Sequence, residues 1–261
     1  MVAFRILLMR LTIILFCALS AFLNIAHTKP LLINSPDWRP YFTYDDTATG
    51  YAKELLRYLL EDNGYTYRFV PLPIKRGNQY IKTGKLDVSI LSYRPERAQF
   101  VSYADFPLFT VSLRFISRPE HANISHVNDI SPLRFEFVRG VSYTQEIREK
   151  ANALERDVYT SVTLEHALKK IMANRSDITA ASTHTLISEL KALGYPKALS
   201  IGAYVVQEKA YYITVSKRSE TITDPTAFFN KMQRSLNKAR QTGLIDQLST
   251  EYQLNLDDLS H

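Results

Sequence analysis

The sequence predicts a mixed α/β fold, built as one large domain or as two smaller lobes. Of its 261 residues, 46% are apolar and 22% are charged, so the chain can bury a core and is not typical of a disordered protein. About 150 residues make one domain, so this length allows either arrangement. Short apolar runs alternate with amphipathic helical patterns along the chain, which favours the α/β class.

The first thirty residues have the pattern of a secretory signal peptide. Arg5 and Arg10 precede an uncharged run over Leu11–Ala26, which is short for a membrane span of about 20 residues. We expect residues 1–28 to be a cleaved signal peptide and the mature protein to be periplasmic. A retained membrane anchor and a buried helix are the alternatives.

Composition narrows the chemistry of the mature chain. Cys17, the only cysteine, lies in the leader, so cleavage leaves no thiol for a disulfide, an iron–sulfur cluster or a nucleophile. The sequence contains none of the motifs GxGxxG, GxxxxGK[ST], GxSxG and HExxH. The net charge is +6, and the basic residues are scattered. We therefore expect no nucleic-acid partner, no metal and no cofactor.

The elements are expected in alternating order. Amphipathic spacing with a glycine after the last turn marks the helices, and apolar runs mark the strands. In the first half we expect strands at Leu31–Asn34, Tyr67–Pro71 and Asp87–Leu91, and helices at Tyr51–Asp62 and Lys75–Lys82. In the second half we expect strands at Asp177–Ala181 and Ala210–Ser216, and helices at 164–172, 183–193, 225–242 and Leu244–Tyr252. Thr163, Thr183 and Asp224 are the expected N-caps of three of these helices.

Two segments of the chain repeat the same local pattern. A helix, a turn residue that tolerates the left-handed conformation, an aspartate and an apolar strand follow one another at Gly84–Asp87 and again at Asn174–Asp177. The repetition predicts two α/β units of similar build.

Five sequence blocks, taken in order, resemble one protein family. They are Pro40–Tyr44 with Gly50 and Glu54, Pro73–Arg76 with Gly84–Asp87, Arg94–Asp105, Asn128–Ile130 with Phe137–Tyr143, and Thr242–Ile245 with Glu251–Tyr252. In this order and spacing the chain is similar to the extracytoplasmic solute-binding proteins of the amino-acid-type transporter family, which have the type II periplasmic binding fold. The resemblance covers nearly the whole mature chain.

The resemblance implies two α/β lobes, each a mixed sheet flanked by helices, with a ligand cleft between them. The first lobe would comprise residues 29–115 and 211–261, and the second would comprise residues 116–210. The chain would cross between the lobes near Leu113–Arg118 and Gln207–Tyr211.

Arg97 is the main candidate for ligand contact. It matches the arginine of the family's Glu-Arg pair, and a guanidinium binds a carboxylate through two hydrogen bonds. The alternative is a surface arginine paired with Glu96 or Asp105. Ser92, Tyr93 and Arg94 replace the small residue and threonine that relatives carry before the Glu-Arg pair, so the resemblance implies an altered pocket floor here.

In the second lobe, Ser182 stands where amino-acid binders usually carry an aspartate for the ligand ammonium, and Thr183 follows it. A hydroxyl cannot balance a desolvated ammonium, so we do not expect a plain α-amino acid. Helix N-capping is the other role open to both residues. Backbone N–H groups at Gly140, Ser142 and Tyr143 are further candidates, as anion donors at a strand-to-helix turn.

Aromatic and cationic side chains complete the candidate site. Phe42 matches an aromatic residue that covers the ligand in relatives, and Trp38 and Tyr41 lie beside it in sequence; core packing is the alternative for them. Arg76 matches an arginine at the cleft edge of some relatives, and a solvated helix position is its alternative.

The function predicted from these residues is capture of a small, polar, carboxylate-bearing solute by hinge closure. The protein would be a monomer without enzymatic activity that serves a membrane permease of an ABC-type transporter. Two alternatives remain open. One is an enzyme similar to cyclohexadienyl dehydratases, and the other is a sensory binding protein that signals to a membrane receptor.

Overall fold

The computed structural model describes residues 29–44, 50–139, 141, 143–152 and 159–254. The chain divides into two units, residues 1–30 and 31–261, and all the described helices and strands lie in the second. The predicted signal peptide, Gly140 and Ser142 lie outside the described residues. Among the described residues, no helix is both long enough and apolar enough to cross a membrane.

Strands and helices alternate, as the sequence predicts. The strands are β1 Leu31–Ser35, β2 Tyr67–Pro71, β3 Val88–Ser92, β4 Val101–Tyr103, β5 Phe109–Ser117, β6 Glu136–Val138, β7 Tyr159–Ser161, β8 Ile178–Ser182 and β9 Ser200–Ser216. The α-helices are α2 Tyr51–Glu61, α3 Ile74–Thr83, α4 Pro95–Ala98, α5 Gln145–Asn152, α6 Leu164–Met172, α7 Thr183–Ala192, α8 Pro225–Gln241 and α9 Leu244–Glu251. Two 3-10 helices, η1 Pro119–His121 and η2 Val127–Ile130, precede β6.

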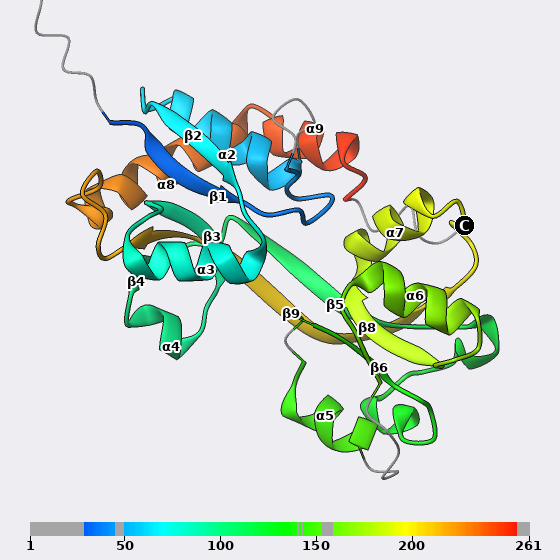
Figure 1. Ribbon diagram of the computed structural model, residues 1–261. Helices are drawn as coiled ribbons and strands as arrows, with labels where there is room; N and C mark the ends of the chain where they lie inside the picture. The colour runs from blue at the N-terminus through cyan, green and yellow to red at the C-terminus, as the bar shows by residue number, and fades with distance from the viewer. Residues whose placement is uncertain (1–28, 45–49, 140, 142, 153–158, 255–261) are drawn as a thin grey trace, which may run out of the picture. The chain divides into compact units, whose positions relative to one another are not determined.

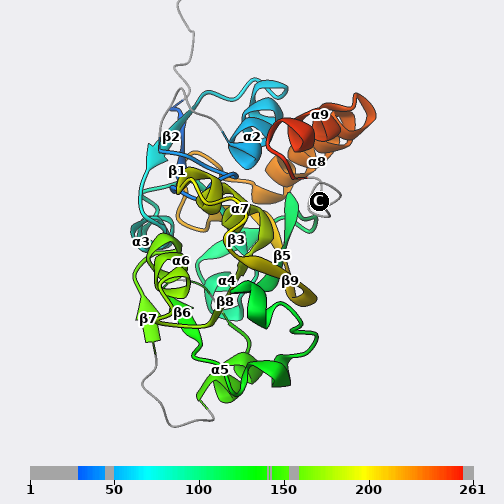
Figure 2. The ribbon, with the colours of Figure 1, turned by 90° about the vertical axis from the view of Figure 1, so that its right-hand side faces the viewer.

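The main sheet continues through both lobes. Its strand order is β2-β1-β3-β9-β5-β8, and β4 also pairs with β9. The first lobe holds β1–β4 with α2–α4, α8 and α9, and the second holds β6–β8 with α5–α7. The long strands β5 and β9 run side by side between these groups (Figures 1 and 2). They are the two crossing segments of a two-lobed periplasmic binding fold.

The pairing of β5 with β9 is interrupted where the strands pass between the lobes. It shifts register between Leu113 and Arg114 and again between Arg114 and Ile116. Irregularities of this kind bend a strand and increase its twist. The predicted lobe boundaries at 115/116 and 210/211 fall inside these two strands, and we keep them as a proposal.

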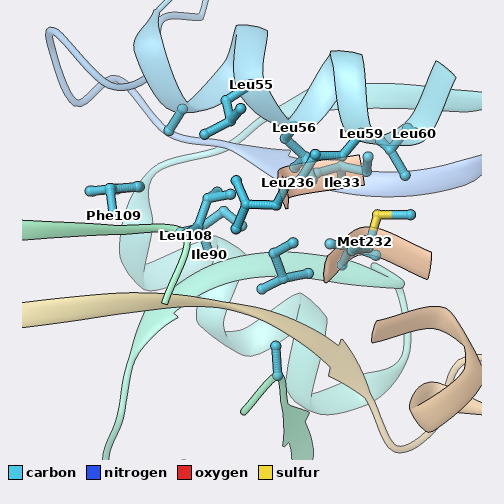
Figure 3. Close-up of a cluster of buried hydrophobic side chains, with 14 of the residues drawn as sticks. Ile33, Leu55, Leu56, Leu59, Leu60, Ile90, Leu108, Phe109, Met232 and Leu236 are labelled. Atoms are coloured by element: carbon cyan, nitrogen blue, oxygen red, sulfur yellow. The ribbon is translucent and has the colours of Figure 1, made fainter. Parts of the chain in front are cut away.

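The apolar core of the first lobe lies between the sheet and the helices α2 and α8. Leu55, Leu56, Leu59 and Leu60 of α2 are all fully buried, as the i,i+4 spacing predicts. They pack against Ile33, Ile90, Leu108, Met232 and Leu236 from β1, β3, the segment before β5, and α8 (Figure 3). The second lobe has two smaller clusters, one around Phe115 and Phe137 and one around Leu168 and Leu186.

Most of the predicted helix ends are confirmed. Thr163 accepts a hydrogen bond from His166 N at 3.2 Å, and Asp224 accepts one from Ala227 N at 3.0 Å. Gly84 ends α3 with a φ of 78°, in the left-handed region that glycine tolerates. The predicted cap at Thr183 was wrong, because Ser182 occupies the N-cap position of α7 and makes no side-chain cap bond.

Candidate functional site

A cleft of about 470 Å³ lies between the two lobes. In the first lobe its lining comes from the ends of β1 and β3, the segment Pro36–Arg39, the first two turns of α3, and α4 with the residue before it. In the second lobe it comes from the end of β6, the first turn of α6, the end of β8, and α7. Residues of β5 and β9 contribute the remaining wall. The cleft is large enough for a small organic solute.

Arg97 lies in the wall of this cleft and is held in place by Ser92. Its Nη1 donates to Ser92 O at 2.9 Å and to Ser92 Oγ at 3.2 Å. Tyr103 also donates to Ser92 O, at 3.1 Å. Among the described residues, no carboxylate lies within ion-pair distance of Arg97. The pairing with Glu96 or Asp105 considered from the sequence is therefore absent from the described contacts.

Two further cations, Arg94 and Lys209, line the same wall. Burial, with the charges of Arg94 and Arg97, lowers the pKa of Lys209 to about 8. Burial and the charge of Arg94 lower the pKa of Arg97. The three side chains thus form one cluster of positive charge, which we call the cationic wall.

Trp38 lines the cleft and is part of an aromatic cluster. Its ring centroid lies 4.7 Å from Tyr41, 4.7 Å from Tyr211 and 5.8 Å from Phe109. Trp38 and Tyr211 line the cleft, whereas Tyr41 and Phe109 lie behind them in the core of the first lobe. The cleft therefore offers apolar ring surface next to its charged wall.

Asn34, which is buried, and Asn78, which is half-buried, contribute polar atoms to the cleft. Asn34 Oδ1 and Asn78 Oδ1 have no hydrogen-bond partner among the described residues. A Cβ atom added at Gly77 would lie 2.3 Å from Asn34 Nδ2, so only glycine lets α3 pack this closely on Asn34. Buried acceptors of this kind suit a ligand that carries hydrogen-bond donors.

Acidic residues line another part of the cleft, and two of them pair with basic neighbours. Asp37 lies 3.6 Å from Arg39, and Glu165 lies 2.5 Å from Lys169. Burial, together with Glu165 and Asp37, raises the pKa of Glu189. In the described part of the chain, no group of three or more His, Cys, Asp or Glu residues could hold a metal ion.

The two lobes also contact each other directly beside the cleft. Trp38 Nε1 donates to Thr185 Oγ1 at 3.2 Å. The His184 ring joins Tyr41 Oη through Nδ1 at 3.1 Å and Leu254 O through Nε2 at 2.9 Å. Burial lowers the pKa of His184, so the neutral ring, which accepts at one nitrogen and donates at the other, suits both contacts.

The structure brings four of the twelve predicted site residues into the cleft lining: Trp38, Ser92, Arg97 and Ser182. Six others do not line it. Phe42 and Tyr41 are buried in the core of the first lobe, Thr183 is buried at the start of α7, and Arg76 and Tyr93 are exposed on the surface. Tyr143 points into the core of the second lobe and accepts a hydrogen bond from Val138 N at 3.0 Å. Gly140 and Ser142 lie outside the described residues.

The cleft residues that sequence reasoning missed include Arg94, Lys209, Asn34 and Asn78. Arg94 is part of the block that carries the family resemblance. Its cationic side chain was a sufficient reason to consider it as a ligand-binding residue. Lys209 precedes Tyr211 by two residues, so both side chains point to the same side of β9. Lys209 lies inside the crossing segment Gln207–Tyr211 that the resemblance implied, but the resemblance assigned it no ligand role. The asparagines had no comparable signal.

The geometry defines a two-lobed binding protein with a charged and aromatic cleft, and the comparisons give its family. The family of bacterial extracellular solute-binding proteins, family 3, matches residues 32–255. The chain belongs to this family. No curated protein matches it significantly in sequence.

Solved structures of similar fold include binding and sensory proteins. A histidine kinase sensor domain with similarity to periplasmic binding proteins is 18% identical, with a TM-score of 0.71, and covers 87% of this chain and 96% of its own. An ancestral arginine-binding protein bound to arginine is 16% identical, with a TM-score of 0.69, over 87% and 99% of the two chains. The GluR0 ligand-binding core from Nostoc punctiforme in complex with L-glutamate is 18% identical, with a TM-score of 0.67, over 85% and 99%. At these identities the likeness concerns the fold.

Proposed function

We propose that this protein captures a small, polar, carboxylate-bearing solute in the periplasm and closes its two lobes around it. The observation that carries the proposal is Arg97, which lines the cleft, is held by Ser92, and has no carboxylate partner among the described residues. The secretory pattern of residues 1–28 and the extracellular family support the location.

Arg97 is suited to bind a carboxylate because its guanidinium is already oriented. The two bonds from Nη1 to Ser92 fix the side chain, so little conformational freedom is lost when the solute binds. A carboxylate would accept hydrogen bonds from the remaining N–H groups, and charge-assisted bonds are about twice as strong as neutral ones. Trp38 and Tyr211 would cover the apolar part of the solute.

Closure would bring the second-lobe side of the cleft, with Ser182 and Thr185, onto a solute already bound to Arg97. The crossing strands β5 and β9 would act as the hinge, and the register shifts around Arg114 place the irregular backbone that such a bend uses. The closed form is the state that an ABC-type permease would recognise, which places the protein in solute uptake.

A sensory role is a second candidate, supported by the likeness to a histidine kinase sensor domain. The binding event would be the same, and the membrane partner would be a receptor. Crosslinking in cells followed by co-purification distinguishes the transport role from the sensory role. We expect a permease to be recovered. Recovery of a receptor would favour the sensory role.

We expect no enzymatic activity from this cleft. A dehydratase-like reaction needs a general acid near the departing hydroxyl. Glu189 is the described cleft carboxyl whose pKa is raised by burial, so it is the residue such a reaction would use. Incubation with prephenate and arogenate should give no product, and turnover that is lost in Glu189→Gln would assign an enzyme instead.

Thermal unfolding of the leaderless protein tests the binding proposal. The panel holds amino acids, di- and tricarboxylates, short peptides, polyamines, sugars and aromatic acids. At a hundredfold excess over Kd, binding adds about 2.7 kcal/mol to the free energy of unfolding. For a protein of this size, this is a rise in Tm of roughly 5–10 °C.

Arg97→Ala should abolish the shift caused by a carboxylate, and Arg234→Ala, an exposed arginine of α8, should leave it unchanged. A shift of equal size in Arg97→Ala would contradict the assignment of Arg97. A protein that is stabilised only by uncharged or cationic solutes would contradict the carboxylate class.

A further inference from the structure

Two residues at the start of α7 in the second lobe reach the aromatic cluster of the first lobe. His184 and Thr185 lie in the first turn of this helix. Thr185 Oγ1 accepts the indole N–H of Trp38 at 3.2 Å, and His184 Nδ1 lies 3.1 Å from Tyr41 Oη. Each bond joins the two lobes, so it exists only while the lobes meet. We call these four residues, two from each lobe, the latch.

The chemistry of the bonded atoms fixes the direction of each hydrogen bond. The indole nitrogen of Trp38 is a donor only, and the hydroxyl of Thr185 can accept. Leu254 O can only accept, so its 2.9 Å contact with His184 requires a proton on Nε2. Burial lowers the pKa of His184 and favours the neutral ring, in which Nδ1 then accepts from Tyr41 Oη. The start of α7 is therefore bonded to two segments of the first lobe, the loop after β1 and the end of α9.

Trp38 connects the latch to the solute site. Its ring is half-buried, lines the cleft, and lies 4.7 Å from the rings of Tyr41 and Tyr211. Tyr41 lies behind it, is only 1% exposed, and stacks on Phe109 with ring centroids 4.6 Å apart. The first lobe thus supplies the rings that pack against the indole, whereas the second lobe binds its N–H group. The orientation of the Trp38 ring depends on both lobes.

We infer that Thr185 and His184 are positioning residues for solute binding, which hold the Trp38 ring over the cleft when the lobes are closed. This inference rests on the proposed function, because it concerns the ring that would cover the solute. It adds that a residue of the second lobe orients a solute contact made by the first lobe. Carboxylates with a larger apolar body would gain most from the latch, because they present more surface to the ring.

The fluorescence of the protein reports on the latch directly, because Trp38 is the only tryptophan in the chain. Thr185→Val keeps the size of the side chain and removes the acceptor of the indole N–H. In this variant, without any solute, we expect a red shift of the emission maximum and stronger quenching by acrylamide than in the wild type. Thr185→Ser keeps the hydroxyl and should restore the wild-type emission.

A matched threonine on another helix serves as the control. Thr83 is exposed in the last turn of α3, and its hydroxyl donates to Gln79 O at 3.1 Å in the same helix. Thr83→Val therefore makes the same chemical change away from the latch. Its emission, quenching and solute binding should equal those of the wild type.

Calorimetry measures the effect of the latch on binding. The probes are acetate, butyrate, hexanoate, phenylacetate, succinate and citrate. Loss of one hydrogen bond of this kind changes an equilibrium about two- to tenfold, so Thr185→Val should weaken binding by that factor. The loss should be smallest for acetate, which offers the least apolar surface. A merely structural role of Thr185 would weaken all the probes alike.

A double-variant cycle tests whether Thr185 acts through Trp38. Trp38→Phe keeps an aromatic ring but has no N–H group for Thr185 to accept. In the Trp38→Phe background, Thr185→Val should therefore cause no further loss of affinity. An undiminished loss in that background would overturn the coupling through Trp38.

The outcomes for the latch and for the proposed function are distinct. Equal emission and quenching in the wild type and in Thr185→Val would overturn the latch, whether or not a carboxylate binds. Failure of every carboxylate tested would overturn the proposed function, and the quenching of the protein alone would still decide whether the latch forms.

Discussion

Each lobe contains a helix–turn–strand unit whose aspartate ties the strand to its neighbour, and the two aspartates are neutralised differently. In the first lobe, Asp87 accepts from Leu32 N at 2.9 Å and from Ser219 Oγ at 2.5 Å. In the second lobe, Asp177 accepts from Arg134 N at 2.8 Å. The backbone N–H of each aspartate also donates to the carbonyl of that same residue, Leu32 or Arg134.

The difference lies in the side chains that meet the two carboxylates. Asp87 has a hydroxyl, whereas Asp177 has two guanidinium groups, from Arg118 at 2.8 Å and Arg134 at 2.7 Å. Glu136, fully buried in the same lobe, accepts from Ser161 Oγ and Lys170 Nζ, each at 2.7 Å. At these matched positions the second lobe therefore uses partly buried ion pairs where the first lobe uses neutral donors.

Asp177→Asn is expected to have the largest effect on stability. It removes the anion that Arg118 and Arg134 share in a partly buried place and leaves Arg118 with only the exposed Glu120, which costs about 2–4 kcal/mol. The corresponding fall in Tm is roughly 5–15 °C. Asp87→Asn is the matched change in the first lobe and should cost about 1–2 kcal/mol, because only neutral donors are lost. Equal losses in the two variants would contradict the distinction between the lobes.

The same comparison predicts how acid affects the stability that Asp177 gives to the second lobe. Burial alone would disfavour the charge of Asp177, but the bonds from Arg134 and Arg118 outweigh it and hold its pKa well below its usual range. This stabilisation is complete above the pKa of the unfolded chain, about 3.9, and is lost as pH falls through the folded-state pKa. Between pH 5 and pH 3, the Tm of the wild type should therefore fall more steeply than that of Asp177→Asn.

A smaller effect is expected at the contact between the lobes. The pKa of His184 is lowered by burial, so its neutral form stabilises the protein above pH 6.5, and this stability is lost as pH falls below that value. His184→Gln should cost about 1 kcal/mol at pH 7.5, where the bonds to Tyr41 and Leu254 are weakened. The gap should narrow by pH 5, as measured by thermal unfolding. A gap that widens on acidification would exclude this role.

Most of the helices and strands could be predicted because the patterns that mark them span only a few neighbouring residues. The repeated aspartate unit is confirmed at Asp87 and Asp177, and the i,i+4 leucines of α2 are buried. Residues 200–206 of β9 were not predicted, whereas Gln207–Tyr211 was expected as a crossing segment and Ala210–Ser216 as a strand. Residues 201–206 (IGAYVV) do form an apolar run, so a local strand signal was present there, and the polar residues 207–209 separate it from Ala210–Ser216.

The candidate site was harder to predict because it is assembled from distant segments. Arg97 was found through the family pattern, and the cleft does place it in the lining. Tyr143 was a candidate because backbone N–H groups at a strand-to-helix turn can bind an anion, but Tyr143 does not line the cleft and its side chain is buried in the second lobe. Lys209 acquires its place only when β9 pairs with β5 and α4 brings Arg94 and Arg97 beside it.

Small-angle X-ray scattering with and without a bound carboxylate tests the central claim, closure of the lobes on an anionic solute. The probe is the carboxylate that gives the largest rise in Tm, at a concentration that saturates the wild type. The radius of gyration should fall in the wild type and in Arg234→Ala, and it should not change in Arg97→Ala. An unchanged radius of gyration in the saturated wild type would contradict the closure mechanism.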